Sequence, residues 1–143
     1  MATDLTARRA KDEMTKVVVS VSPDDSMTEA LGLMADYRLT VLPVANSKNR
    51  CVGILSTSDL VDPARWRNGD TFDWDKNLGD KKVCDMMTAD VASVDRETPL
   101  VNVAGTMLRL KIHHLPVVDE NQQLLGILST MDVLAAFATA HEK

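Results

Sequence analysis

The sequence predicts an α/β (α+β) protein built from two pseudo-symmetric β-α-β-β-α repeats packed face to face. The main observation is that residues 53–59 (G-I-L-S-T-S-D) return almost unchanged as residues 126–132 (G-I-L-S-T-M-D). The same offset of 73 residues also pairs Met14-Thr15 with Met87-Thr88, and Leu42-Pro43-Val44 with Leu115-Pro116-Val117. A duplication at a constant offset outweighs local propensity, and two copies imply a packed pair rather than a long solenoid.

Each repeat opens with a short strand and an amphipathic helix. We expect the strand at residues 17–19 (V-V-V) and, in the second repeat, at residues 91–93. The helix is expected over Met27–Tyr37 and over Leu100–Leu110, because apolar residues recur there at helical spacing. Acidic and hydroxyl residues just before each helix suit its N-terminal turn.

Two further strands and a closing helix complete each repeat. The predicted strands are Val41–Ala45, Cys51–Ser56, His114–Asp119 and Leu124–Ser129. Short polar connections between them favour antiparallel hairpins. The closing helix is expected to be short after Ser58 and to run from Met131 to Ala140 in the second repeat.

Repeated prolines and glycines predict particular positions in this fold. Pro43 and Pro116 have no N–H to donate to a sheet, so we expect them at strand ends or at a sheet edge. Gly32 and Gly105 fall in the middle of a predicted helix, where glycine costs roughly 0.5–1 kcal/mol relative to alanine. Their recurrence predicts a close approach between helices near the pseudo-twofold axis.

The chain divides into five segments by sequence. These are an N-terminal segment expected to be helical (1–13), the first repeat (14–62), an aromatic-containing linker (63–86), the second repeat (87–138) and a C-terminal tail (139–143). The linker holds Trp66, Phe72 and Trp74. Three roles fit these aromatic residues: pinning the linker onto the core, contributing to a dimer contact, or covering a pocket.

Composition limits the class of protein. With 143 residues, 45% hydrophobic and 26% charged, the chain can bury its own core. It has no apolar run long enough for a membrane span and no secretory signal, so we expect a cytoplasmic protein. The formal net charge of −5 argues against nucleic-acid binding. A disulfide between Cys51 and Cys84 is not expected in that compartment, and Cys51 is interpreted as a small buried residue of a strand.

The repeated Gly-Ile-Leu-Ser-Thr-x-Asp motif marks the junction of the last strand with the last helix, and it has two interpretations. A serine followed three residues later by an aspartate resembles a capping box, in which case the motif only starts a helix. The same junction also suits a nucleotide. Backbone N–H groups at a helix N-terminus attract phosphate, hydroxyl groups add donors, and the aspartate can accept hydrogen bonds from ribose. The glycine allows backbone or ligand to come close.

Together, the repeated Met-Thr, Leu-Pro-Val and Gly-Ile-Leu-Ser-x-x-Asp motifs resemble a tandem pair of CBS (cystathionine β-synthase) domains, often called a Bateman module. The resemblance extends from Met14 to about Phe137. It implies a disc-like module that often dimerises. It also implies adenosine-containing ligands in clefts between the repeats, of the AMP, ADP, ATP, S-adenosylmethionine or NAD type.

By position, the resemblance assigns Asp59 and Asp132 to ribose. The other residues it implies are Ser56, Thr57, Ser58, Ser129 and Thr130 for phosphate, and Val17, Val18, Asp90 and Val91 around the base. Family members often carry a basic residue before Leu-Pro-Val. The second repeat has Lys111, His113 and His114 there, whereas the first has Arg38. Met131 replaces Ser58 in the second copy, which removes one hydroxyl.

Neither a metal site nor a catalytic set is predicted. Neighbouring residues of a strand point to opposite faces, so His113 and His114 are not expected to share a metal ion. No nucleophile with a credible acid–base partner is found in the sequence. We therefore expect no enzymatic activity and no required cofactor.

The predicted function is a non-enzymatic regulatory module that binds an adenine nucleotide or related adenosyl ligand and signals to an unknown protein effector by linkage. A homodimer is expected, because helix residues Met27, Leu31, Met34 and Met107 form apolar faces. The alternative is a ligand-free dimerisation or protein-interaction scaffold, and an enzyme is a weaker third option. Because the second repeat has more cationic donors, we expect the site at Asp132 to fill first.

Overall fold

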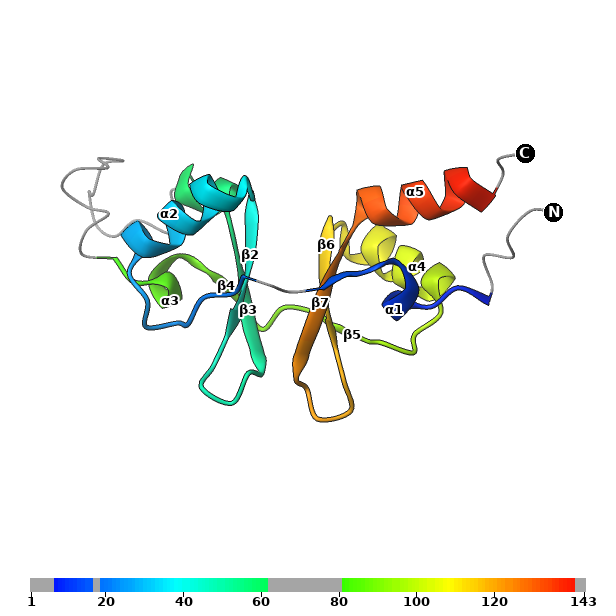
Figure 1. The fold of residues 1–143 in the computed structure, drawn as a ribbon, viewed down its shortest axis with the longest axis horizontal. Coiled ribbons are helices and arrows are strands. Elements are labelled where there is room, and N and C mark those ends of the chain that lie inside the picture. Colours follow the sequence, from blue (N-terminus) through cyan, green and yellow to red (C-terminus); the bar gives the residue numbers. More distant parts are fainter. Residues whose placement is uncertain (1–6, 17–18, 62–80, 141–143) are drawn as a thin grey trace. The chain divides into compact units, whose positions relative to one another are not determined.

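The two repeats exchange their opening segments in the three-dimensional structure. The computed structural model describes residues 7–16, 19–61 and 81–140, which divide into two compact units (Figure 1). Of the described residues, unit 1 holds 7–16 and 92–140, and unit 2 holds 19–61 and 81–91. Each unit therefore contains most of one repeat and the first residues of the other.

Unit 2 is built on the first repeat. Its elements are α2 (Met27–Tyr37), β2 (Val41–Ala45), β3 (Cys51–Ser56), the 3₁₀ helix η2 (Thr57–Val61), α3 (Val83–Met86) and β4 (Thr88–Ala89). The strands β2 and β3 form an antiparallel hairpin, and β4 pairs antiparallel with β3, giving the order β2-β3-β4. The last two elements come from the opening of the second repeat.

Unit 1 is built on the second repeat. Its elements are α1 (Ala10–Glu13), β1 (Thr15–Lys16), β5 (Val94–Asp95), α4 (Leu100–Leu110), β6 (His114–Val118), β7 (Leu124–Ser129) and α5 (Thr130–Ala140). The strand order is β1-β7-β6-β5, in which only the β5–β6 pair is parallel. Here α1 and β1 come from the opening of the first repeat.

The predicted helices and hairpins are confirmed, but the predicted opening strand was wrong in position. Residues 91–93 form no strand, and β5 begins at Val94 instead. The equivalent residue in unit 2, Val21, forms a single parallel bridge to Val44. Val21 and Val94 are both buried against the hairpin. Because of this burial, Val21 and Val94 make the strand pairs of the opening segments, and the residues predicted for this role do not. Val17 and Val18 lie outside the described residues.

Predictions for the chain ends and the linker are only partly covered by the structure. In the segment expected to be helical (1–13), α1 spans four residues, and residues 1–6 lie outside the described part. At the other end, α5 continues to Ala140, past the predicted start of the tail. Trp66, Phe72 and Trp74 lie outside the described residues.

The prediction that the prolines occupy strand ends or an edge was wrong for unit 1. Pro116 lies inside β6, which has a strand on either side. Pro43 lies in the middle of β2, opposite Ile54. The amide of Thr57 donates to the carbonyl of Thr40 (2.9 Å), so in the alternating antiparallel pattern Pro43 falls at a non-hydrogen-bonded pair. A missing N–H at that position does not weaken the hairpin.

Glycines at the head of the repeated motif allow the exchanged strands to pack. A Cβ atom on Gly126 would lie 2.7 Å from both the Thr15 carbonyl oxygen and the Met14 Sδ, and a Cβ on Gly53 would lie 2.8 Å from the corresponding atoms of Thr88 and Met87. Only glycine fits where another backbone comes this close. The repeated Met-Thr pair and the repeated glycine therefore form one contact, made once in each unit.

Within the described residues of its own unit, neither Gly32 nor Gly105 has a close helix neighbour, and the approach predicted between helices of the two repeats stays a prediction. A Cβ built on either glycine meets no atom within 4 Å among the described residues. The two glycines lie on helix surfaces that the described part of each unit leaves open.

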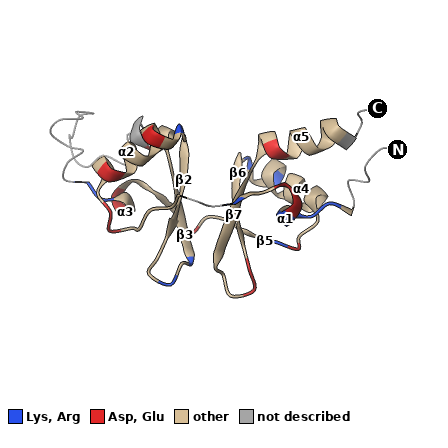
Figure 2. Ribbon diagram, viewed as in Figure 1, with Lys and Arg blue, Asp and Glu red and all other residues tan. Residues whose placement is uncertain are grey.

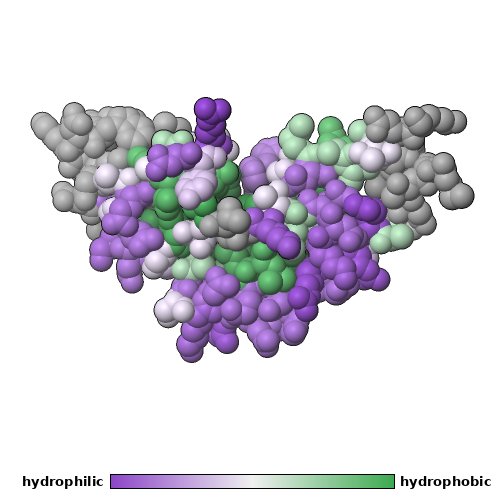
Figure 3. All heavy atoms as spheres, in the orientation of Figure 1, coloured by the Kyte–Doolittle hydropathy of each residue, from purple (hydrophilic) through white to green (hydrophobic). Residues whose placement is uncertain are grey.

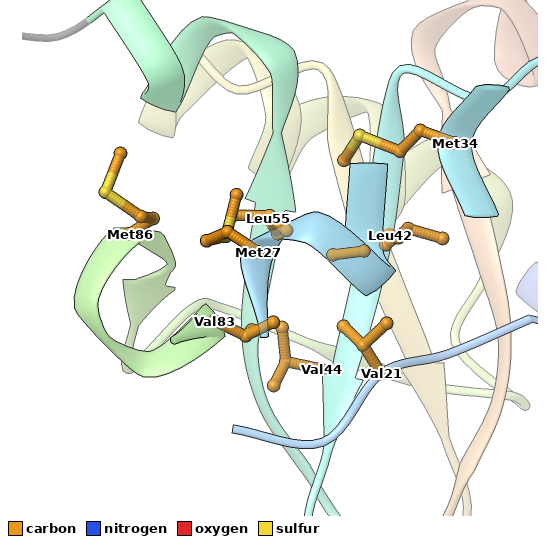
Figure 4. Packing of buried hydrophobic residues seen from close by; sticks show 9 residues of the cluster. Val21, Met27, Met34, Leu42, Val44, Leu55, Val83 and Met86 are labelled. Carbon is orange, nitrogen blue, oxygen red and sulfur yellow. The ribbon is translucent and has the colours of Figure 1, made fainter. Parts of the chain in front are cut away.

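Each unit has its own hydrophobic core. In unit 2, Met27 and Met34 of α2 pack with Leu42, Leu55 and Met86 (Figure 4). In unit 1, the corresponding cluster contains Val103 and Met107 of α4 with Leu115 and Leu128 of the hairpin. α1 and α3 contribute to these cores through Ala10 and through Val83 and Met86, so the exchange of opening segments is part of how each core is filled.

The cysteines are free thiols, as expected. Cys51 is half-buried in β3, where its thiol donates to the carbonyl of Gly53 (S···O 3.6 Å), and Cys84 is exposed. Burial raises the pKa of the Cys51 thiol, so it stays protonated and unreactive. Among the described helices, none is long and apolar enough to cross a membrane.

Candidate ligand site

The second copy of the motif forms a reciprocal cap at the start of α5. The amide of Ser129 donates to Oδ2 of Asp132 (2.8 Å), and the amide of Asp132 donates to Oγ of Ser129 (3.1 Å). This is the capping geometry that the sequence allowed. It places a hydroxyl and a carboxylate side by side at the N-terminus of an 11-residue helix, where the dipole also favours an anion.

The first copy makes a tighter cluster. The amide of Ser56 donates to Oδ2 of Asp59 (2.9 Å), and the Ser56 hydroxyl donates to the same oxygen (3.3 Å). The hydroxyls of Ser56 and Ser58 lie 2.8 Å apart and share a hydrogen bond. Asp59 is only 7% exposed, and the turn continues into the 3₁₀ helix η2 rather than an α-helix.

An aspartate that caps a helix can still bind a ligand, but the aspartates of the two motifs differ in how accessible they are. A carboxylate has two oxygens and about four acceptor positions, so one oxygen can cap while the other accepts from a ribose hydroxyl. Asp132 is partly exposed and can be reached from solvent. Asp59 is buried, so its carboxylate is less accessible to a ribose.

Basic residues stand at the end of the first long helix in both units. Lys111 is the C-cap of α4 with φ 56° and ψ 46°, and Arg38 is the C-cap of α2 with φ 55° and ψ 47°. Residues other than glycine and asparagine rarely adopt this left-handed conformation. A cation there interacts favourably with the carboxyl end of the helix. Both side chains are exposed.

The two histidines have different surroundings, as expected. His113 is exposed, and its carbonyl accepts from the amide of Thr130 (2.9 Å). His114 begins β6 opposite Ser129. Burial lowers the pKa of His114, the neighbouring His113 lowers it further, and the carboxylate of Asp132 opposes both effects. No group of three or more His, Cys, Asp or Glu residues in the described part of the chain is arranged to hold a metal ion.

The predicted base-binding residues are only partly placed. Asp90 and Val91 belong to the second repeat by sequence, but they follow β4, which pairs antiparallel with Gly53 and Ile54, and lie in unit 2. Asp90 is exposed and has a positive φ of 53°. Val17 and Val18 are outside the described residues.

A hollow of about 410 Å³ lies between α4 and α5 in unit 1. Its walls are Ala104, Met107, Leu108, Ile112, Val133 and Leu134, with Lys111, His113 and Thr130 among its lining. Sequence analysis had assigned those last three residues to the ligand, and the structure brings them together. It missed the apolar walls. Leu108 and Leu134 lie outside the apolar stripes of their helices that contact the core. In the sequence, the second apolar stripe of α4 was the signal that could have predicted these walls.

The order of elements, the exchanged strands and the duplicated strand-to-helix junction define a tandem pair of small α+β domains. A family model for the CBS domain matches this chain over residues 10–63 and 83–139. The chain belongs to the CBS domain family, as the resemblance of its motifs had suggested. Both matches include α1 or α3, the short helices that precede Met-Thr.

Several curated proteins share this pair of domains. The chain is 34% identical over 127 residues to an uncharacterised 17.7 kDa protein of Acidianus ambivalens, covering 89% of this chain and 71% of that one. It is 30% identical over 129 residues to inosine-5′-monophosphate dehydrogenase of Methanocaldococcus jannaschii, covering 89% of this chain. The chain spans only 23% of that dehydrogenase, so the match concerns one part of a larger enzyme.

Solved structures of CBS domain pairs have the same fold. CBSX2 in complex with AMP superposes with a TM-score of 0.79 at 29% identity, covering 94% of this chain and 99% of that one. CBSX2 from Arabidopsis thaliana, at 30% identity, gives a TM-score of 0.77 over 93% of this chain and 96% of that one. A CBS domain pair in complex with 5′-methylthioadenosine and S-adenosyl-L-methionine, at 23% identity, gives 0.75 over 92% and 97% and supports the fold alone.

Proposed function

We propose that this protein is a non-enzymatic regulatory module that binds an adenine nucleotide or a related adenosyl ligand. The ligand would bind at the strand-to-helix junctions and change the affinity for a protein effector. The observation that supports this most is the Ser129–Asp132 cap, which presents a hydroxyl and a partly exposed carboxylate at the N-terminus of α5. AMP bound to the related CBSX2, at 29% identity, favours the same ligand class.

In this proposal each residue has a separate role. Asp132 would accept hydrogen bonds from ribose hydroxyls through the carboxylate oxygen that does not cap the helix. Ser129 and Thr130 would donate hydroxyls to phosphate, while Lys111 supplies positive charge and His113 a ring N–H donor. The corresponding residues of unit 2 are Ser56, Thr57, Ser58, Asp59 and Arg38, with Asp90 and Val91 near the base. The buried Asp59 favours Asp132 as the site that fills first.

We also propose that the protein acts as a homodimer. By linkage, the ligand would then change the affinity of dimer formation or of effector binding. It would do so by the same factor by which dimer formation or effector binding changes the affinity for the ligand. The cytoplasmic location expected from the sequence stays a prediction.

A thermal-shift panel tests the ligand class. AMP, ADP, ATP, S-adenosylmethionine, NAD and GTP would be added separately to the full chain. A ligand at 100 times its dissociation constant stabilises the native state by about 2.7 kcal/mol, which corresponds to a rise of several degrees in melting temperature. We expect at least one adenosyl ligand to give this rise and GTP to give a smaller one.

The second candidate is a scaffold that works without a ligand. It is favoured by the hydrogen bonds of the motif, since capping alone explains Ser56 with Asp59 and Ser129 with Asp132. If none of the adenosyl ligands raises the melting temperature, the nucleotide proposal is wrong and the scaffold is the better explanation.

A further inference from the structure

Part of the exposed apolar surface of unit 1 lines the hollow between α4 and α5. The sequence predicted apolar helix faces at four residues: Met27, Leu31, Met34 and Met107. That prediction was wrong for the three methionines, which are at most 4% exposed and belong to the cores. Leu108 and Leu134 are instead 79% and 62% exposed, and both are walls of the hollow. Apolar side chains are visible over α5 in the space-filling view (Figure 3).

The hollow has the size and the walls of a small-molecule site. Its volume of about 410 Å³ falls in the range of roughly 300–1,000 Å³ that is usual for ligand pockets. Most of its lining residues are apolar: Ala104, Met107, Leu108, Ile112, Val133 and Leu134. A polar group placed against these walls would lose its hydrogen bonds to water without replacement. The walls therefore suit an apolar group.

The polar residues of the lining can all bind an anion. Lys111 carries a positive charge, His113 has a ring N–H, and Thr130 has a hydroxyl. Lys111 and His113 follow the last residue of α4, and Thr130 is the first residue of α5. The amide of Thr130 donates to the carbonyl of His113 (2.9 Å), which holds these two residues side by side. The hollow thus has hydrogen-bond donors where α4 ends and α5 begins, and apolar walls along both helices.

The ammonium group of Lys111 can meet a ligand at this place. Lys111 is exposed, and no salt bridge between described residues involves it. An exposed cation beside apolar walls complements a molecule that joins a negative charge to an apolar chain.

No acidic residue belongs to the lining. Asp132 is the single charged residue in the sequence of α5, and Arg109 is the single one in α4 (Figure 2). Neither of them lines the hollow. Residues three and four apart share one face of a helix, so Thr130 lies with Val133 and Leu134, whereas Asp132 lies on another side of α5. The charge that faces the hollow is therefore positive.

The first repeat lacks this combination of residues. Counting back 73 residues, Leu108 corresponds to Ala35 and His113 to Thr40, so a large apolar wall and a ring donor are missing there. The closing helix of the first repeat is the five-residue η2, while α5 has 11 residues. The apolar walls and the anion donors are thus a property of the second repeat and do not follow from the duplicated motif.

We propose that this hollow binds an amphipathic anion, a single apolar chain that ends in a carboxylate, as in a fatty acid. The carboxylate accepts hydrogen bonds from Lys111, His113 and Thr130, and the chain lies between α4 and α5 against Leu108 and Leu134. The proposed function assigns the same three donors to phosphate, but it gives the apolar walls no role. The fatty acid is measured without a nucleotide, so its failure is distinct from a failure of nucleotide binding.

Isothermal titration calorimetry of the full chain with dodecanoate, kept below its micellar concentration, tests the proposal. We expect saturable binding of one dodecanoate per chain. Dodecyltrimethylammonium has the same chain with a positive head, and it should bind at least about 10-fold more weakly because it cannot accept these hydrogen bonds. Dodecyl phosphate carries another anionic head, and tighter binding than dodecanoate would overturn the choice of a carboxylate.

Two matched pairs of variants separate the head from the chain. Lys111→Gln should weaken dodecanoate binding about 10-fold, the effect of losing a hydrogen bond to a charged group. Arg109→Gln removes a cation outside the lining and should leave the affinity within about twofold. Leu108→Gln should weaken binding about fivefold through lost apolar contact, whereas Leu110→Gln, also outside the lining, should stay within about twofold.

Thermal melting of each variant controls for folding, and all four replaced side chains are exposed. A wild-type chain without saturable dodecanoate binding would overturn the proposal, as would equal weakening by the two members of either pair. A dodecanoate affinity that falls as the protein concentration rises would show that a second copy of the chain covers the hollow, and this result would also overturn it.

Discussion

The junctions at Ser56–Asp59 and Ser129–Asp132 begin alike and then diverge. In both, the serine amide donates to the aspartate three residues later, at 2.9 and 2.8 Å. Beyond that point unit 2 continues as a five-residue 3₁₀ helix with a buried aspartate, and unit 1 continues as an 11-residue α-helix with a partly exposed aspartate. The shared residues thus determine the turn, whereas the residues after it determine access to the carboxylate.

The glycines at the head of the two motif copies match between the units, and both are buried. Gly53 and Gly126 sit under the exchanged Met-Thr strands, and a Cβ on either would come within 2.8 Å of backbone oxygen. Surface residues around the junctions are free of this constraint. Met131 can therefore stand where the first repeat has Ser58. Its side chain is 71% exposed and lies outside the lining of the hollow between α4 and α5.

The largest expected effect tests whether the glycine contact is equivalent in the two units. Gly126→Val and Gly53→Val should each lower the free energy of unfolding by about 3 kcal/mol, because the added side chain overlaps the backbone of Thr15 or Thr88. Urea unfolding measures both variants. If one variant unfolds as wild type does, the exchanged strand is not held in the same way in that unit.

The next effect separates the two aspartates as ligand-binding groups. Asp132→Ala should weaken the best adenosyl ligand by roughly 1.5–3 kcal/mol, the range for hydrogen bonds to a charged group. Asp59→Ala is the matched control and should change affinity less, because Asp59 is buried. Isothermal titration calorimetry gives both values.

Loss of the helix cap could imitate this result, so Asp132→Asn is needed as well. Asparagine keeps a side-chain oxygen that can accept from the Ser129 amide as Asp132 does, so this variant should remain stable while still losing affinity. Unchanged binding in both Asp132 variants would mean that ribose recognition has been assigned to the wrong residue.

A smaller effect compares the two exposed helix glycines. Gly32→Ala and Gly105→Ala should each raise the free energy of unfolding by about 0.5–1 kcal/mol, since alanine favours a helix and the added Cβ meets open space in both cases. Thermal or urea unfolding of the separate variants measures this. A lower free energy of unfolding in either variant would mean that its glycine does not face open space.

The smallest expected effect is a pH dependence of the free energy of unfolding that arises in unit 1 alone. The pKa of His114 in the native state lies below its ordinary value of about 6.5, mainly because of burial, so the unfolded chain binds more protons in that range. The stability contributed by neutral His114 should therefore be lost as pH falls below about 6.5. His114→Val introduces the residue found at the equivalent position, Val41, and should flatten the pH profile of urea unfolding between about pH 5 and pH 7. A profile identical to wild type would exclude His114 as its source.

Much of the fold could be predicted because its signals are local. Helical spacing predicted α2 and α4 with their observed bounds, and short polar turns predicted both hairpins. The duplication then allowed each prediction in one repeat to be checked in the other. The candidate site was predicted in the same way as far as Ser129, Asp132 and Lys111, because these residues belong to the junction or stand next to it in the fold.

The sequence by itself determined the long helices, both hairpins, the repeated junction and the family, since these depend on residue order over short distances. Tertiary structure alone decided that Met14-Thr15 packs on Gly126 and Met87-Thr88 on Gly53, because strand pairing joins residues far apart in the chain. It also decided that Met107 is buried and Leu108 exposed. Both residues are apolar neighbours on α4, and only the packing of the hairpin against one side of that helix distinguishes them.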